Sequence, residues 1–279
     1  MKTLQVVCLA VIGGFVIACG RSSSARASAN SAAPASAQHL GLATAANATP
    51  VLASSGQWVL AVSTSTQHGD TNVYAATSED GGARFHAPVR VNDVEGEAHV
   101  YGEDPTRVAM GESSPSEGPP EIVVTWPSSR AKHLGLRSAR SVDGGRTFAP
   151  SVSIGDLAVD GERGFQSVTV GRDRVVRAAW LDGRRDPGTP HHTNAGGDFD
   201  PMHLMYGSGG DGNWSVETRL ASNVCGCCKT AIATGTDRSV YVAFRNIYRV
   251  ICETSRSPCL ATAVARSRRR FASVRITGR

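Results

Sequence analysis

Three cysteines within four residues are the most chemically distinctive feature of this sequence: Cys225, Cys227 and Cys228 in the run Cys-Gly-Cys-Cys. The adjacent His191 and His192 stand in a long polar stretch that precedes them. Thiolate and imidazole suit copper or zinc, so these side chains are candidates for a metal or redox site. On a strand Cys225 and Cys227 could share one face, whereas Cys228 could not, so a metal site needs a loop. A disulfide, between 225 and 228 or between 227 and 228, is the alternative, and we favour it as a structural clamp.

A second motif, Ser-x-Asp-Gly-Gly-x-x-Phe, occurs twice. Its residues are Ser78, Asp80, Gly82 and Phe85 in the first copy, and Ser141, Asp143, Gly145 and Phe148 in the second. Asp and Ser side chains can bond the amides of their own turn, and the glycines permit the positive φ of a tight hairpin. The motif therefore predicts a self-contained cap on a β-hairpin, with a structural role.

These two copies resemble Asp-box repeats, also called BNR repeats, which mark sialidase-like β-propellers. The resemblance implies an all-β fold of four-stranded antiparallel blades, six in the sialidase type. It implies a glycosidase with a Tyr nucleophile as one function, and three arginines that grip a carboxylate. Arg163, Arg184 and Arg245 are the best matches here, with Asp182 as a further ligand-binding candidate. The Cys-Gly-Cys-Cys run itself is similar to one in uncharacterised bacterial lipoproteins with Asp boxes.

The spacing of strand-like segments supports four strands in each repeat. The serines at 78, 141, 208 and 267 recur every 59–67 residues, although the last two copies of the motif are degraded. Apolar segments recur between them at 106–111, 166–171 and 230–235, and again at 121–126, 175–180 and 239–244. A period of about 60 residues with four short strands is typical of a propeller blade. Residues 51–279 suffice for about four blades, so we expect a truncated six-blade ring. Residues 250–279 depart from the repeat, and a shifted reading frame would explain this departure.

Antiparallel blades divide the loops between two rims. The turns with the Asp boxes, between third and fourth strands, lie on one rim, and the links between blades lie on the other together with the second–third loops. All the candidate residues outside the Asp boxes fall in the second set. Three functions compete for that rim: binding of a glycan, a protein or another ligand, which we favour; exo-glycosidase activity of the sialidase type; and a metal or redox site. No Tyr–Glu pair can be assigned from the sequence.

The N-terminus predicts export and lipidation. Residues 1–18 combine Lys2 with an apolar run too short for a transmembrane helix, as in a signal peptide. The run ends in Val-Ile-Ala-Cys, which resembles a bacterial lipobox and implies a lipid on Cys19. Residues 19–50 are rich in Ser and Ala and predict a flexible linker before a propeller domain at 51–279. Because Gly20 follows the cysteine, we expect an outer-membrane lipoprotein, periplasmic or on the cell surface.

The charge distribution argues against nucleic acid as a partner. The net charge is +5, but residues 253–279 alone carry seven Arg and one Glu, which leaves −1 for the rest of the chain. Nucleic-acid binding needs a patterned basic face on a recognisable module. Beyond Cys8 and Cys19, five cysteines remain in a compartment that permits disulfides, so at least one of them stays unpaired within the chain.

Overall fold

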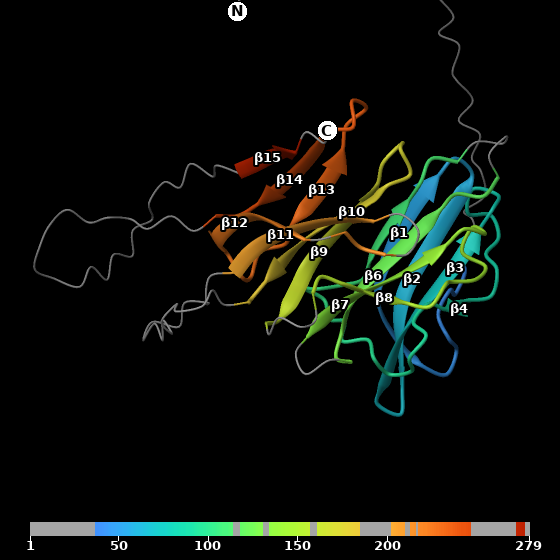
Figure 1. Ribbon diagram of the computed structural model, residues 1–279. Helices are drawn as coiled ribbons and strands as arrows, with labels where there is room; N and C mark the ends of the chain where they lie inside the picture. The colour runs from blue at the N-terminus through green and yellow to red at the C-terminus, as the bar shows by residue number, and fades with distance from the viewer. Residues whose placement is uncertain are drawn as a thin grey trace, which may run out of the picture. The chain divides into compact units, whose positions relative to one another are not determined.

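The computed structural model describes residues 37–113, 118–130, 134–156, 161–184, 202–209, 213–215, 217–246 and 272–276. Every regular element in these ranges is a β-strand, and the strands form four antiparallel sheets (Figure 1). The described part of the chain has no helix long and apolar enough to cross a membrane.

The first sheet is a four-stranded meander in chain order. It consists of β1 (Ala46–Ser55), β2 (Trp58–Gln67), β3 (Asp70–Ser78) and β4 (Val89–Arg90). Because β1 begins at Ala46, the sheet includes the last five residues of the segment that the sequence predicted as linker.

The second and third sheets repeat this order. The second holds β5 (Arg107–Met110), β6 (Ile122–Ser128), β7 (Gly135–Ser141) and β8 (Val152–Ile154). The third holds β9 (Arg163–Val170), β10 (Val176–Asp182), β11 (Met202–Gly209) and β12 (Thr218–Val224). β6 and β10 are buried along their whole length, which explains why these segments read as continuous apolar runs.

The fourth sheet has three described strands: β13 (Ala231–Thr234), β14 (Val240–Phe244) and β15 (Ala272–Ile276). β15 comes from the tail that departs from the sequence repeat, yet it pairs with β14 in antiparallel register. In this sheet β15 takes the position of the third strand of a blade. The sequence repeat predicts the third strand earlier in the chain, before residue 267.

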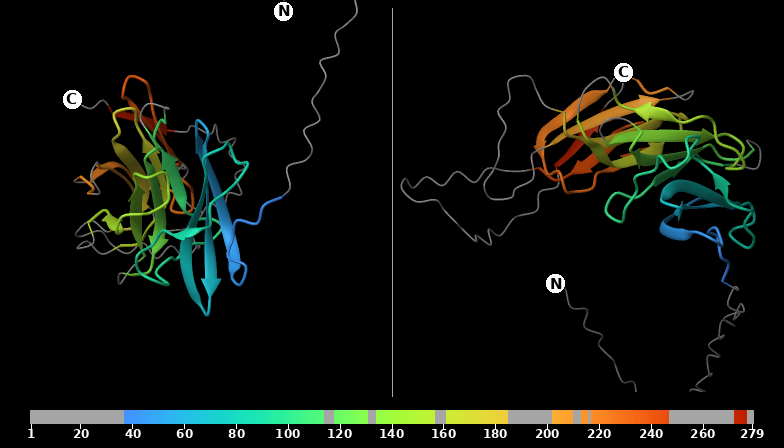
Figure 2. Two further views of the ribbon diagram at one scale, coloured as in Figure 1. Left: turned by 90° about the vertical axis from the view of Figure 1, so that its right-hand side faces the viewer. Right: turned by 90° about the horizontal axis from the view of Figure 1, so that it is seen from below.

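Consecutive sheets pack through shared cores. Leu60 and Val73 of the first sheet share one core cluster with Ile122 and Trp126 of the second. Figure 2 shows the sheets side by side. Leu136 of the second packs with Trp180 of the third, and a further cluster joins the third sheet to the fourth. The first strands of neighbouring sheets, β1, β5, β9 and β13, are in contact in that order. The four sheets therefore lie side by side, and their first strands, β1, β5, β9 and β13, are innermost.

Candidate functional site

One rim of the sheets carries the two Ser-x-Asp-Gly-Gly turns, and we call it the turn rim. In the first turn Ser78 Oγ donates to Asp80 Oδ1 at 2.8 Å and accepts from the Gly82 amide at 2.9 Å. The Arg84 amide donates to Asp80 Oδ1 at 2.9 Å. Gly81 and Gly82 have positive φ, which the tight turn requires. The side chains thus stabilise the backbone of their own turn.

The second turn repeats this geometry. Ser141 Oγ donates to Asp143 Oδ1 at 2.7 Å and accepts from the Gly145 amide at 2.8 Å. Burial opposes ionisation of Asp143, but hydrogen bonds from Thr147 and Ser141 outweigh it and lower the pKa of Asp143 to about 2. Phe148 packs on the core between the first two sheets. The aspartate therefore remains an ionised acceptor.

Both turns close the connection between the third and fourth strand of a meander sheet, β3 to β4 and β7 to β8. Four-stranded meanders packed side by side through their first strands are the blades of a propeller. The fold is that of a β-propeller. In this propeller the neighbouring turns also contact each other, through an ion pair between Glu79 and Arg146.

Comparisons with known proteins find similar solved structures but little sequence likeness. No family model and no curated protein matches the sequence. Among solved structures, the propeller is similar to an α-L-arabinofuranosidase from Fusarium graminearum, with 16% identity over 66% of this chain and a TM-score of 0.43. It is similar to an α-L-arabinanase from Penicillium chrysogenum, with 14% identity over 70% and a TM-score of 0.42. It is also similar to the NanB sialidase from Streptococcus pneumoniae, with 11% identity over 70% and a TM-score of 0.39. This chain spans 53%, 57% and 26% of those three chains.

The opposite rim of the propeller, which we call the link rim, carries the segments that join the blades. Three of the four predicted ligand-binding residues meet there: two arginines bind the carboxylate of the third residue, Asp182. Arg163 Nε donates to Asp182 Oδ2 at 3.0 Å, and Arg184 donates to the same oxygen at 2.6 Å. Asp182 is fully buried and Arg163 is nearly so. Burial alone would raise the pKa of Asp182, but the hydrogen bonds from Arg184 and the charge of Arg163 hold it below its usual value.

Other donors of these arginines have partners within the propeller, although Arg184 Nε has none among the described residues. Arg163 donates to the carbonyl oxygens of Asp156 and Gly161, and Arg184 forms an ion pair with Glu217. The fourth predicted residue, Arg245, is exposed and has its guanidinium 3.5 Å from Cys228 Sγ. The three arginines therefore do not share one target: two hold Asp182 and the third lies beside a cysteine.

Among the carboxyl groups of the link rim, the pKa of Asp104 is raised the most, and the sequence did not mark this residue as a site candidate. Asp104 is 3% exposed, and burial raises its pKa to about 6 against the opposing hydrogen bond from the Phe165 amide. Its Oδ1 lacks a hydrogen-bond partner among the described residues. A Cβ on Gly164 would lie 2.5 Å from Asp104 Oδ2, so the carboxyl fits here only because residue 164 is glycine. Gly164 in a strand was the one available sequence signal for this close approach.

An exposed aromatic ring lies three residues before Asp104. Tyr101 is 43% exposed, and its ring stands edge-on to that of His99 with 6.2 Å between centroids. Burial and the nearby charge of Asp104 raise the pKa of Tyr101, so its hydroxyl stays protonated and can donate. The link between the first two blades thus combines an exposed aromatic ring with a buried carboxyl oxygen that has no partner among the described residues.

The same link supplies a second buried carboxyl, next to a cavity. Glu97 is 4% exposed, burial raises its pKa, and its Oε1 has no partner in the described ranges. A cavity of about 450 Å³ lies nearby; its lining includes Asp93, Ser128, Arg130 and Arg137. Arg137 is held by Ser151 and Ser153, which leaves Arg130 as the more available cation.

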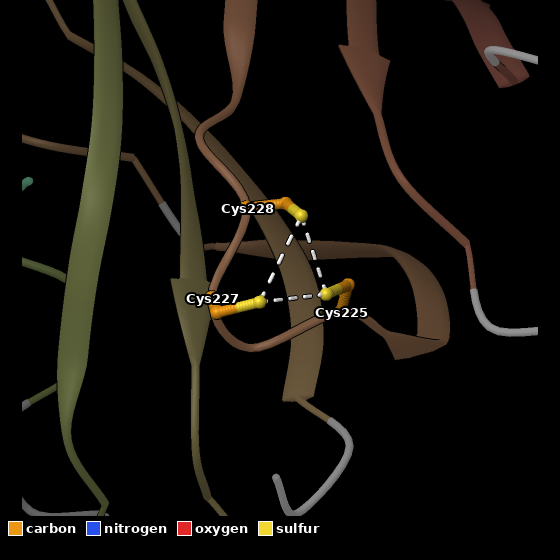
Figure 3. Close-up of side chains that lie close together, drawn as sticks. All are labelled: Cys225, Cys227 and Cys228. Atoms are coloured by element: carbon orange, nitrogen blue, oxygen red, sulfur yellow. Dashed lines mark hydrogen bonds between the residues drawn. The ribbon is translucent and has the colours of Figure 1, made fainter. Parts of the chain in front are cut away.

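The three cysteines converge in a tight turn, as Figure 3 shows. Cys225 Sγ lies 3.2 Å from both Cys227 Sγ and Cys228 Sγ, and the last two sulfurs are 3.9 Å apart. All three are free thiols, which differs from the disulfide favoured on sequence grounds. The turn lifts the restriction that a strand would impose, so all three could hold one metal ion. His191, His192 and Cys19 lie outside the described residues.

Proposed function

We propose that this chain is an exported, lipid-anchored propeller that binds a ligand of the glycan class on its link rim, as a binding protein rather than an enzyme. The observation that carries the proposal is the composition of the link between the first two blades. It combines the half-exposed ring of Tyr101 with two buried carboxyls, Glu97 and Asp104, that each retain an oxygen without a partner among the described residues.

This combination matches the chemistry of a sugar. A pyranose or furanose ring offers an apolar face of C–H groups, which packs on an aromatic side chain, and hydroxyls that donate to carboxylate oxygens. A buried acceptor without a partner is costly, and both oxygens are closed to solvent, so a ligand hydroxyl would reach them only if the link opens on binding. Asp104 and Glu97 supply such acceptors, and Tyr101 supplies the ring.

A panel of immobilised oligosaccharides, probed with the full chain, tests this function. We expect at least one glycan to bind, and both Tyr101→Ala and Asp104→Asn to weaken that binding by about tenfold or more. Tyr241→Ala is the matched control, since Tyr241 is also 43% exposed but lies in β14, away from the link. Binding that is unchanged in both link variants, or no glycan bound by protein with native β-structure, would overturn the proposal.

Anchoring is tested separately at Cys19. If the lipobox is used, mass spectrometry of the mature protein should find a lipidated N-terminal cysteine at position 19. Cys19→Ser should then shift the protein from the detergent phase to the aqueous phase of a phase-separation assay, whereas Cys259→Ser should not. Retention of Cys19→Ser in the detergent phase would contradict a lipid anchor at this residue.

A second candidate, glycoside hydrolysis, is favoured by one specific observation. The pKa of Asp104 is raised to about 6, which is the range in which a carboxyl can act as general acid near neutral pH. A fluorogenic sialoside is the appropriate probe because of the sialidase resemblance. Turnover that disappears in Asp104→Asn would support hydrolysis, and no turnover by glycan-binding wild-type protein would leave the binding function alone.

A further inference from the structure

The Cys225–Cys228 turn is held in place from both ends. Before it, Val224 is fully buried and bridges to Asn246. Within it, the Cys225 amide donates to the Arg245 carbonyl at 2.9 Å, and the Cys228 amide donates to the Cys225 carbonyl at 3.3 Å. After it, Thr230 Oγ1 donates to the Phe165 carbonyl at 2.7 Å. These contacts hold the backbone of the turn that carries the three thiols.

The sulfur–sulfur distances fit a metal ion better than a disulfide. A disulfide needs about 2.05 Å between two sulfurs, and it would leave the third thiol without a role. Thiolates at about 2.3 Å from a tetrahedral zinc ion lie roughly 3.8 Å apart. The three observed distances, 3.2, 3.2 and 3.9 Å, need an expansion of at most about 0.6 Å to reach that value.

We propose that Cys225, Cys227 and Cys228 form a three-thiolate site for one thiophilic metal ion, with Zn²⁺ or Cu⁺ as the ion. This site does not depend on the ligand proposed for Tyr101 and Asp104. Binding replaces the S–H bonds by metal–sulfur bonds and releases those protons to solvent. No electron is transferred, so the site needs no oxidant or reductant.

The charges around the turn favour the divalent ion. Three thiolates with Zn²⁺ carry −1, and the guanidinium of Arg245, 3.5 Å from Cys228 Sγ, balances that charge. The same thiolates with Cu⁺ would carry −2 and keep a net negative charge after Arg245 is counted. Cys227 is exposed and the other two thiols are partly exposed, so a fourth position of a tetrahedral ion is open to water or to an external ligand.

The test measures metal content in the full chain, purified under reductant and dialysed against a weak chelator. We expect one equivalent of zinc per chain. Replacement of the zinc by Co²⁺ should give a sulfur-to-cobalt charge-transfer band in the near ultraviolet and intense tetrahedral visible bands, a readout that needs no enzyme activity. Titration of the metal-free protein with Cu⁺ against a coloured Cu⁺ chelator forms the second arm, and tighter retention of Cu⁺ than of Zn²⁺ assigns the site to copper.

Single variants identify the ligands. Cys225→Ser, Cys227→Ser and Cys228→Ser should each reduce retained metal below a tenth of the wild-type level. Cys252→Ser and Cys259→Ser are the matched controls and should leave one equivalent. Cys227 is exposed, so Cys227→Ser should retain the far-ultraviolet spectrum of the wild-type protein. Arg245→Gln should weaken metal binding about 10–100-fold, as removal of an outer-shell partner typically does, and Arg245→Lys should restore part of it.

Three results would overturn the site. One is reduced, folded protein that retains neither zinc nor Cu⁺. Another is Cys227→Ser with unchanged metal content. The last is native protein, isolated without added oxidant, in which mass spectrometry finds two of these cysteines joined as a disulfide and no metal present.

Discussion

Breaking the buried ion pair at Asp182 should destabilise the propeller far more than breaking an exposed pair of the same chemistry. Asp182→Asn keeps the side-chain volume, so no cavity forms, but it leaves the buried guanidinium of Arg163 without its counter-charge. Removing one partner of a buried pair costs about 3–5 kcal/mol in the free energy of unfolding. For a domain of this size the corresponding fall in Tm is about 6–20 °C.

Glu112 and Arg172 provide the matched control. Their side chains are 67% and 64% exposed, against 0% and 3% for Asp182 and Arg163, although the N–O distances are similar at 2.7 and 3.0 Å. An exposed pair contributes at most about 1 kcal/mol, so Glu112→Gln should have little effect. Urea denaturation of both variants, monitored by circular dichroism and by tryptophan fluorescence, measures the two losses and checks that the probes agree.

The pH dependence adds an internal check on Asp182. Its pKa in the folded state lies below its usual value, so the contribution of the pair is present above the unfolded-state pKa of about 3.9 and is lost as the pH falls through the folded-state pKa. The gap between wild type and Asp182→Asn should therefore narrow below about pH 4. Equal losses of less than about 1 kcal/mol in the buried and exposed variants would refute the reasoning from burial. Normal stability of Asp182→Asn together with lost glycan binding would instead assign Arg163 and Arg184 to the ligand.

Two further predictions separate strain from function. Because the pKa of Asp104 is raised to about 6, the folded state binds a proton that the unfolded chain gives up, so stability should fall as the pH rises from about 4 to 6. Asp104→Asn should remove this dependence of stability on pH. At pH 7 it should raise the free energy of unfolding, measured by urea titration, by on the order of 2–3 kcal/mol. If the free energies of unfolding of the two proteins change in parallel with pH, the raised pKa is contradicted. Gly145→Ala should lower the free energy of unfolding by roughly 2–3 kcal/mol, since φ is +87° and the new Cβ would lie 2.5 Å from Thr77 Oγ1. Gly81→Ala, at φ +73° with open space around it, should lower it by only about 1 kcal/mol. Equal losses of stability in urea denaturation would argue against the clash at Gly145.

Much of the architecture could be predicted because it is encoded locally. The segments predicted at 106–111 and 230–235 contain β5 and β13, and the segment at 166–171 overlaps β9, which begins earlier, at Arg163. Each is a short apolar run bounded by turn residues. β15 was not predicted, because the tail lacks the repeat and its pairing with β14 is a long-range contact. The start of β1 was placed too late, because Ala46–Pro50 has the composition of a linker and becomes a strand by pairing with β2.

The candidate site was harder to predict, because its chemistry depends on packing between blades. The sequence indicated that Arg163, Asp182 and Arg184 lie on one rim, but not that both arginines share the buried carboxylate. It gave no sign that Asp104 is buried, since that burial follows from the approach of Gly164 in the next blade. The cysteine spacing left a metal site open but favoured a disulfide, and only the turn between 225 and 228 brings all three sulfurs together.

The aspartates of the Asp-box turns and the carboxyls of the link between the first two blades differ in how completely their oxygens are bonded, and this difference favours the link as the place of the proposed ligand. On the turn rim, the oxygens of Asp80 and Asp143 accept from side chains and amides of their own turns, so a ligand would have to compete with those bonds. On the link rim, Glu97 and Asp104 each keep a buried oxygen without a partner among the described residues, and three thiols lie within bonding reach of one ion. A buried carboxyl oxygen without a partner destabilises the fold through the cost of its desolvation. The carboxyls and the thiols lie on the same rim, which is the rim where we propose that a hydroxylated ligand and a metal ion bind.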